Sequence, residues 1–194
     1  MTSLAASRLA ELLLYHPLGL DESSGEPTHV RTPAGRSLEL RGAEFAHEVG
    51  ERFGSTVALM KLRNGIFDEA AVSMISLATM AGVGREAGFD LDRRRFRANI
   101  VLDTLATDPF LEDGGVGGTL LFGDHGVGAA VSVTTRDVRC VMINLDPETA
   151  AHDPRVLKAA VRLNANNAGV YGAVVRTGTI AVGQPVRLVM DERP

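Results

Sequence analysis

The sequence predicts a β-rich α+β fold built around a barrel, with helices at its periphery. Short apolar stretches rich in β-forming residues recur along the chain and are separated by Gly, Asp and Pro turns. Between them lie longer segments with helical periodicity. Strands and helices mixed in this way are typical of α+β proteins and partly open barrels. We expect residues 1–55 to form a helical and hairpin extension and residues 56–194 to form the barrel domain.

Composition narrows the range of functions. The chain of 194 residues has 45% hydrophobic and 23% charged residues, a formal net charge of −4 and no Trp. This charge balance does not favour nucleic acid or a membrane surface as a partner. A single cysteine excludes an intrachain disulfide and a zinc site with several thiolates. The amino terminus lacks signal-peptide features, and no apolar run approaches the ~20 residues of a membrane span, so we expect a cytoplasmic protein.

The first third of the chain predicts an alternation of helices and short strands. Leucines at helical spacing predict a helix over residues 3–14, and Gly54 follows a second helical pattern as a C-cap glycine. Alternation around a Pro-Ala-Gly turn at 33–35 predicts a hairpin. The expected elements are a helix at 3–14, a hairpin at His29–Leu40, a helix at Gly42–Phe53 and a strand at Ser55–Leu62.

Two central segments carry the more specific expectations. The apolar run Ala70–Ala81 contains Ser76 and Thr79, which favours a strand that turns into a helix capped by one of these residues. Residues 90–103 alternate with a period of two and predict a strand with one apolar and one cationic face. The cationic face would carry Arg93, Arg95, Arg97 and Asn99.

The last third predicts a loop followed mainly by strands. Asp153 and Pro154 form a favourable N-cap and first-turn pair for one helix. The expected elements are a loop at Asp108–Gly118, strands at Thr119–Phe122, Ala129–Thr135 and Cys140–Leu145, a helix at Asp153–Asn164, and strands at Val170–Arg176 and Thr179–Met190.

The arginine strand and Cys140 are the candidate halves of a site. Guanidinium groups bind phosphate or carboxylate in pairs, and cations near a thiol favour the reactive thiolate. Two simpler interpretations compete with this one. A charged strand can be a solvated sheet edge, and a lone cysteine is commonly a small buried apolar residue. The histidines lack metal-ligand spacing, and Glu112 and Asp113 have the pattern of turn residues more than of an acid/base pair.

The order of several motifs resembles that of the MOSC domain, named for the carboxy-terminal part of molybdenum cofactor sulfurases. Each motif alone is weak, whereas all of them in order are specific. The segments that carry the resemblance are Phe67–Glu69 with Val72–Ser76, Arg95–Asp103, Phe110–Asp113, Gly118–Asp124, Arg139–Cys140, Leu145–Thr149 and Asn167–Val186. The resemblance covers roughly residues 60–190.

The resemblance implies a MOSC-type β-barrel that binds molybdenum cofactor, a molybdopterin. Cys140 would be the catalytic thiolate and molybdenum ligand, and Arg97 and Asn99, with Arg95 and Arg139, would hold the anionic pterin phosphate. A soft anionic thiolate suits molybdenum, and a guanidinium suits phosphate. As an enzyme the domain would reduce N-hydroxylated small molecules. Its electrons would come from a separate electron-transfer protein.

The alternative implied by the resemblance is a non-enzymatic sulfur carrier or accessory module. Longer relatives begin with an additional β-region whose Lys, Ser and Arg hold the cofactor, and we expect this chain to be a short form without it. On this interpretation Cys140 would accept a persulfide from a sulfur-donor protein. No pyridoxal phosphate is expected, because the sulfurase domain that binds it has no counterpart in the chain.

Overall fold

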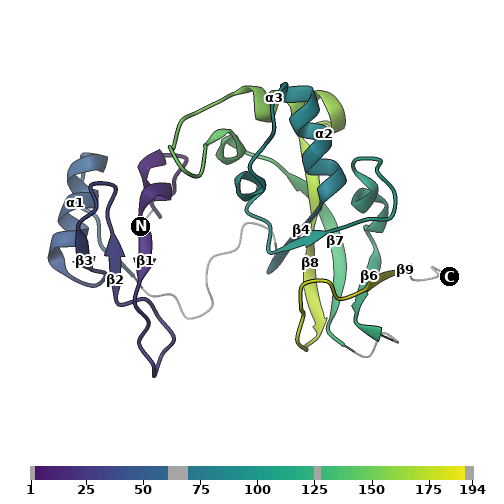
Figure 1. Cartoon of the computed structure of the whole chain (residues 1–194), viewed down its shortest axis with the longest axis horizontal. Coiled ribbons are helices and arrows are strands. Elements are labelled where there is room, and N and C mark those ends of the chain that lie inside the picture. Colours follow the sequence, from purple (N-terminus) through teal and green to yellow (C-terminus); the bar gives the residue numbers. More distant parts are fainter. Residues whose placement is uncertain (1–2, 61–69, 125–127, 191–194) are drawn as a thin grey trace. The chain divides into compact units, whose positions relative to one another are not determined.

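The computed structural model describes residues 3–60, 70–124 and 128–190 (Figure 1). Contacts divide the chain into two compact units: residues 1–66 with 145–152, and residues 67–144 with 153–194. The division after residue 55 stays a prediction, because contacts do not show which part of the chain folds independently.

The first unit contains a three-stranded antiparallel sheet and one helix. Strand β1 (His16–Leu18) pairs with β2 (His29–Arg31), which pairs with β3 (Ser37–Glu39). The β2–β3 pair confirms the predicted hairpin, with Val30 opposite Leu38 and both side chains buried. Helix α1 (Ala43–Phe53) ends at Gly54, whose φ of 74° confirms it as the expected left-handed cap.

Two expectations for the first unit are wrong. In place of a helix over 3–14 there is only the 3₁₀ helix η1 (Ala10–Leu14), because the extended backbone of Leu9 (φ −142°) interrupts helical geometry before it. Residues 55–60 form no strand, and residues 61 and 62 lie outside the described residues.

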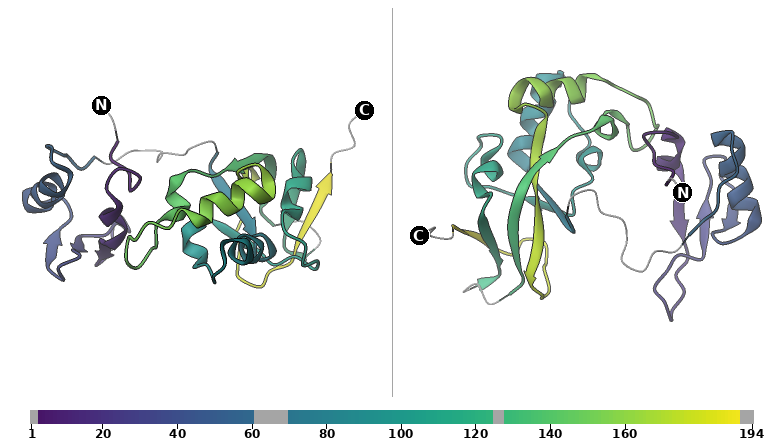
Figure 2. Two further views of the ribbon diagram at one scale, coloured as in Figure 1. Left: turned by 90° about the horizontal axis from the view of Figure 1, so that it is seen from above. Right: turned by 180° about the vertical axis from the view of Figure 1, so that it is seen from behind.

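The second unit is built on a curled six-stranded sheet that forms a half-barrel (Figures 1 and 2). The strand order is β5-β4-β8-β7-β6-β9, and only the β4–β5 pair is parallel among the pairs of this sheet in the described residues. The strands are β4 (Val72–Ser76), β5 (Ile100–Leu102), β6 (Gly118–Phe122), β7 (Ala130–Val138), β8 (Asn167–Arg176) and β9 (Val186–Met190). This architecture confirms a mixed, β-rich α+β fold with peripheral helices.

The two faces of this sheet support separate cores. Consecutive residues of β4 point to opposite faces, so Ile75 packs with the helices and Met74 packs inside the curl of the sheet. Helices α2 (Leu77–Ala87) and α3 (Arg155–Asn164) lie side by side on the Ile75 face (Figures 1 and 2), where Val83 and Val156 share one cluster. Strand β4 is therefore packed on both of its faces, one against each core.

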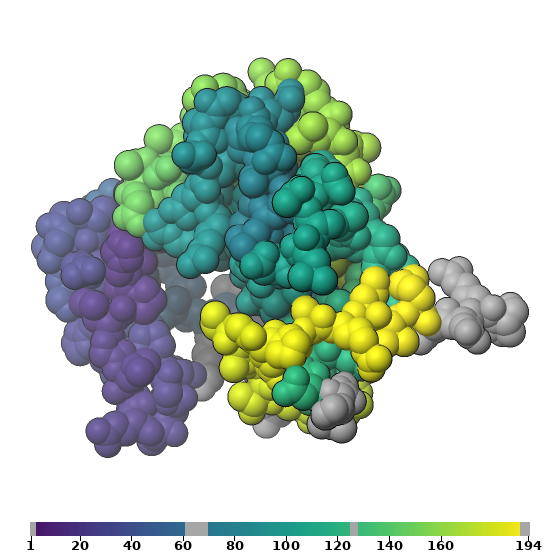
Figure 3. Space-filling model, turned by 45° about the vertical axis from the view of Figure 1, so that its right-hand side comes forward, coloured from purple at the N-terminus to yellow at the C-terminus, as the bar shows by residue number. Residues whose placement is uncertain are grey.

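Several local predictions for the second unit are confirmed. Strand β4 passes directly into α2, and Ser76 caps the helix by accepting a hydrogen bond from Thr79 N at 3.0 Å. The predicted strands that correspond to β6, β7 and β8 are present. The predicted helix is α3, but its N-cap is Pro154 and not Asp153, whose Oδ1 accepts from Arg155 N at 3.0 Å. Strand β9 is shorter than predicted. It lies on the surface in the yellow segment of Figure 3, with Leu188 and Met190 exposed.

Two predicted loop or strand segments fold as 3₁₀ helices. Residues 140–145 do not form a strand, because Val141–Asn144 form η5, and within the predicted loop Leu111–Gly115 form η3.

In the described ranges, no helix combines the length and apolar character needed to cross a membrane.

Candidate functional site

The predicted arginine strand is wrong and is replaced by a turn. Arg93–Phe96 form the 3₁₀ helix η2, which begins at Asp92, whose Oδ1 accepts from Arg94 N at 2.8 Å. Arg97 ends it in the left-handed conformation with φ of 52°, and strand β5 starts only at Ile100. Because the backbone turns here, the arginines do not share one face of a strand.

The turn separates the arginines into buried and exposed ones. Arg95 is buried and its Nη1 donates to the carbonyl oxygen of Asn144 at 3.0 Å. Arg93 and Arg97 are exposed, and their side chains form no hydrogen bond or ion pair in the described part of the chain. Together with Arg94, Ala98 and Val101 they line a hollow of about 320 Å³. The exposed cations can therefore bind an anion without first breaking an internal ion pair.

Asn99 lies next to this hollow in sequence but uses its side chain internally. Its Oδ1 accepts from Ser73 N at 2.8 Å and from Ser73 Oγ at 3.1 Å. Its backbone N donates to Ser73 O at 2.9 Å. These bonds fix the start of β5 against β4, and they leave the Asn99 amide nitrogen as the group available to a ligand.

Cys140 follows the carboxyl end of β7 and is exposed. Its carbonyl oxygen accepts from Ile143 N at 3.4 Å at the start of η5. The structure therefore does not support the interpretation of this cysteine as a small buried apolar residue. The thiol is accessible to a ligand or a reagent.

Arg139 precedes Cys140 and is buried, with its guanidinium directed into the protein. Nε donates to the carbonyl oxygen of Ala168 at 2.7 Å, and Nη1 donates to the carbonyl oxygen of Phe96 at 2.8 Å. Nη2 lies 2.9 Å from Asp137 Oδ2 as an ion pair, and the Phe96 ring lies 5.5 Å from the guanidinium carbon. The Arg139 guanidinium thus contacts three partners, namely Ala168, Phe96 and Asp137.

Burial lowers the pKa of Arg139, because desolvation disfavours the cation, and the nearby Asp137 carboxylate opposes this effect. The ion-pair contact at Nη2 is short in distance but does not have the angle of a good hydrogen bond. Asp137 is itself only 2% exposed. A buried guanidinium and carboxylate compensate each other's loss of hydration, so removing either one alone is costly.

The Arg139–Phe96 hydrogen bond joins the two predicted halves of the site. It links residues 43 positions apart in the chain. Arg97 directly follows the acceptor residue, and Cys140 directly follows the donor residue. The structure therefore brings the exposed thiol segment and the exposed arginine segment to the same region, whereas Arg95 and Arg139 are directed into the protein beneath it.

Sequence reasoning missed two polar residues that support this region. Glu112 is 8% exposed and its Oε1 accepts from Ser76 N at 3.0 Å, so it is a buried anchor and not only a turn residue. Asp137 is the buried partner of Arg139. The Asp-x-Arg spacing of Asp137 and Arg139 was a usable signal, since on one strand face residues i and i+2 are neighbours.

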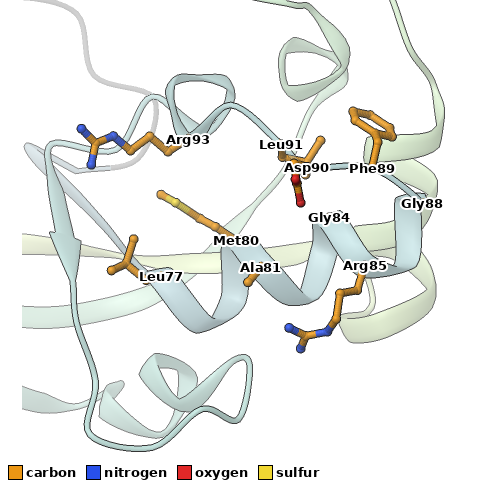
Figure 4. Close-up of a pocket in the computed structure, with 10 residues that line it drawn as sticks. All are labelled: Leu77, Met80, Ala81, Gly84, Arg85, Gly88, Phe89, Asp90, Leu91 and Arg93. Atoms are coloured by element: carbon orange, nitrogen blue, oxygen red, sulfur yellow. The ribbon is translucent and has the colours of Figure 1, made fainter.

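A larger hollow of about 710 Å³ lies along α2, lined mainly by apolar side chains such as Leu77, Met80 and Leu91 (Figure 4). Arg93 is common to its lining and to that of the smaller hollow. Its lining includes neither Cys140 nor Arg97. Arg97 lines only the smaller hollow, and Cys140 lines neither of the two.

A metal at Cys140 would have to bring other ligands with it. Across residues 3–60, 70–124 and 128–190, no group of three or more His, Cys, Asp or Glu side chains has a metal-binding arrangement. A single exposed thiol and an exposed arginine segment would suit a metal that arrives within an anionic organic cofactor.

Fold and site together define an α+β half-barrel protein with an accessible thiol beside an arginine turn. The chain belongs to the MOSC domain family: the model of the MOSC domain matches residues 51–187. This match confirms the resemblance drawn from the ordered motifs. The motif residues 67–69 lie outside the described residues.

A crystal structure of the YuaD protein from Bacillus subtilis is similar in fold, with a TM-score of 0.50 and 18% sequence identity. The similarity covers 63% of this chain and 65% of YuaD, which is less than two thirds of that protein. At this identity the likeness supports the fold alone. A search of curated proteins found no match.

Proposed function

We propose that this MOSC domain binds molybdenum cofactor, with Cys140 as the protein ligand of the metal and Arg97 as the counter-ion of the pterin phosphate. One observation carries the proposal. The Arg139–Phe96 hydrogen bond of 2.8 Å places the residue before Cys140 against the residue before Arg97. A thiol and a cation that are both exposed can then act on one ligand.

The chemistry of these residues fits the cofactor. An exposed guanidinium without an internal partner can form paired hydrogen bonds with a phosphate, and Arg93 lines the same hollow of about 320 Å³. An accessible thiolate is a soft anionic ligand for molybdenum. When bound, the cofactor would supply two-electron redox chemistry for a small N-hydroxylated substrate, with electrons from a separate partner protein.

The remaining predicted residues take indirect roles in this proposal. Arg95 and Arg139 donate to carbonyl oxygens of the protein, so they hold the turns that carry the ligating residues. Asn99 uses Oδ1 to fix β5 on β4 and can offer only its amide nitrogen to the phosphate. We therefore assign direct contact to Cys140 and Arg97, with Asn99 as a further donor.

The test is the molybdenum and pterin content of protein expressed in a molybdenum-replete cytoplasm, the compartment in which we propose it acts. Wild-type protein should contain both, Cys140→Ser should lose molybdenum, and Arg97→Gln should lower pterin content. Arg187→Gln, an exposed cation on β9, is the matched control and should resemble wild type. Wild-type protein without molybdenum or pterin, from a host that loads a known MOSC protein, would contradict the proposal.

A second candidate function is favoured by the exposure of Cys140, because a sulfur carrier needs a thiol that a donor enzyme can reach. In this case Cys140 would accept one sulfur atom as a persulfide from a cysteine desulfurase. Mass spectrometry after incubation with the desulfurase and cysteine should show one added sulfur on wild-type protein. The same adduct on Cys140→Ala would exclude this role for the residue.

A further inference from the structure

Among the Asp-x-Arg ion pairs of the described residues, two share a further contact with a phenylalanine ring and differ in burial. Asp137 pairs with Arg139 at 2.9 Å and Asp153 pairs with Arg155 at 2.6 Å. Each guanidinium also lies over a phenylalanine ring, 5.5 Å from Phe96 for Arg139 and 4.6 Å from Phe89 for Arg155. The side chain of Arg139 is 7% exposed, whereas that of Arg155 is 59% exposed.

Burial gives Arg139 contacts that its surface counterpart lacks. Its three guanidinium nitrogens are directed at the Ala168 carbonyl, the Phe96 carbonyl and the Asp137 carboxylate. Its backbone is fixed as well, since Arg139 N donates to Asn166 O at 2.8 Å and Asn166 Nδ2 donates to Arg139 O at 2.7 Å. The residue before Cys140 is thus held at both its main chain and its side chain.

We infer that Arg139 is a positioning residue that keeps Cys140 and Arg97 close enough to act on one ligand. The inference rests on the proposed function, in which these two residues belong to one site. Arg139 acts through the carbonyl oxygen of Phe96, and it touches no ligand itself. Its role depends on the shape of the guanidinium fork and not only on its charge.

Lysine tests this distinction, because it keeps the charge but offers one compact ammonium group in place of a planar fork. Arg139→Lys can contact Asp137 or one carbonyl oxygen, but it cannot span Ala168 and Phe96 with the same geometry. The Phe96–Arg97 turn then loses its bond to the Cys140 segment. A role based on charge alone would be preserved in the lysine variant.

The readout is the rate of Cys140 alkylation by iodoacetate divided by the rate with iodoacetamide, in buffer of about 10 mM ionic strength where screening is weak. Both reagents react with the thiolate, so the ratio cancels any change in the ionised fraction of the thiol. A nearby cation accelerates only the anionic reagent. One unpaired cation at roughly 10 Å changes the ratio by about twofold in water.

Four variants decide the inference. Arg97→Gln removes a cation and should lower the ratio about twofold. Arg139→Lys should lower it to nearly the same value although the number of charges is unchanged, and Arg155→Lys should leave it at the wild-type value. A wild-type ratio in folded Arg139→Lys, or in Arg97→Gln, would overturn the inference. If Arg139→Lys does not fold, Asp137→Glu replaces it, because it keeps every charge but moves the carboxylate that contacts Nη2; a lowered ratio supports and an unchanged ratio overturns the inference.

These measurements use protein without bound metal, so they are separate from the test of the proposed function. Absence of molybdenum from wild-type protein would contradict cofactor binding but leave the alkylation ratios interpretable. Conversely, molybdenum-containing wild-type protein with a ratio that does not respond to Arg139→Lys would contradict only the positioning role.

Discussion

Asn99 Oδ1 accepts two hydrogen bonds from Ser73, one from the backbone N at 2.8 Å and one from Oγ at 3.1 Å. Ser73 lies in β4, and Asn99 lies between the arginine turn and β5. These hydrogen bonds therefore fix the segment that carries Arg97 against β4, a strand in which four of five residues are buried. The candidate site is anchored to the core through this contact.

Asn99→Ala should lower the free energy of unfolding by about 1–2 kcal/mol, because it removes both acceptor interactions with Ser73. Ser73→Ala removes the Oγ contacts with Asn99 Oδ1 and, at 3.3 Å, with Asn99 N, but it keeps both backbone hydrogen bonds and should cost about half as much. Urea unfolding of the two variants measures the difference. If Asn99→Ala leaves stability unchanged and lowers only pterin content, Asn99 serves the ligand and not the fold.

Gly169→Ala should be strongly destabilising. The φ of Gly169 is 91°, and a Cβ there would lie 2.5 Å from Met74 O and 3.1 Å from Arg139 Nη2. Gly35 has a similar φ of 81°, but an added Cβ there would meet open space, so Gly35→Ala isolates the cost of the backbone conformation, about 1 kcal/mol. We expect Gly169→Ala to lose at least about 2 kcal/mol more in thermal or urea unfolding. Equal losses would mean that the neighbours of Gly169 move aside easily.

Glu112→Ala should cost about 1–3 kcal/mol of stability, because it leaves the buried Ser76 N–H at the start of α2 without its acceptor. Glu112→Gln keeps an acceptor oxygen and should lose less. Urea unfolding of both variants distinguishes the hydrogen bond from the charge as the source of the effect. A loss as large in Gln as in Ala would assign the effect to the negative charge.

The stability of the protein should fall between pH 4 and pH 2 partly because of Asp153. Its hydrogen bond with the Arg155 side chain lowers the pKa of Asp153 from 3.8 to about 2. A carboxylate whose pKa is lower in the folded than in the unfolded state stabilises the fold above about pH 4 and loses this contribution as pH falls towards 2. Asp153→Asn should therefore show a shallower decrease in unfolding midpoint over this range than wild type.

Asp108→Asn, which changes an exposed loop carboxylate, is the control for this titration. It should retain the slope of the wild-type protein between pH 4 and pH 2. An equally steep decrease in Asp153→Asn and wild type would show that the Asp153–Arg155 contact is broken in solution.

The sequence determined those features that depend on neighbouring residues. Ser76 at the end of an apolar run predicted the β4–α2 junction, and Gly54 predicted the end of α1. The motif order predicted the family, and the lone thiol and the arginine run pointed to the residues of the candidate site. Caps, turns and hydrophobic periodicity act within a few residues, which is why they can be recognised without a structure.

Only the tertiary structure decided which arginines face outward and which hold the fold. Alternation placed Arg95 and Arg97 on one face, but the cap at Asp92 and the left-handed Arg97 turn the chain, so Arg95 is buried and Arg97 exposed. Arg139 binds the carbonyl oxygens of Phe96 and Ala168, which lie 43 and 29 residues away. Carbonyl oxygens are present in every residue, so no sequence pattern marks them as acceptors. The Arg139–Phe96 hydrogen bond, which links the segments of Cys140 and Arg97, therefore forms only once the chain has folded.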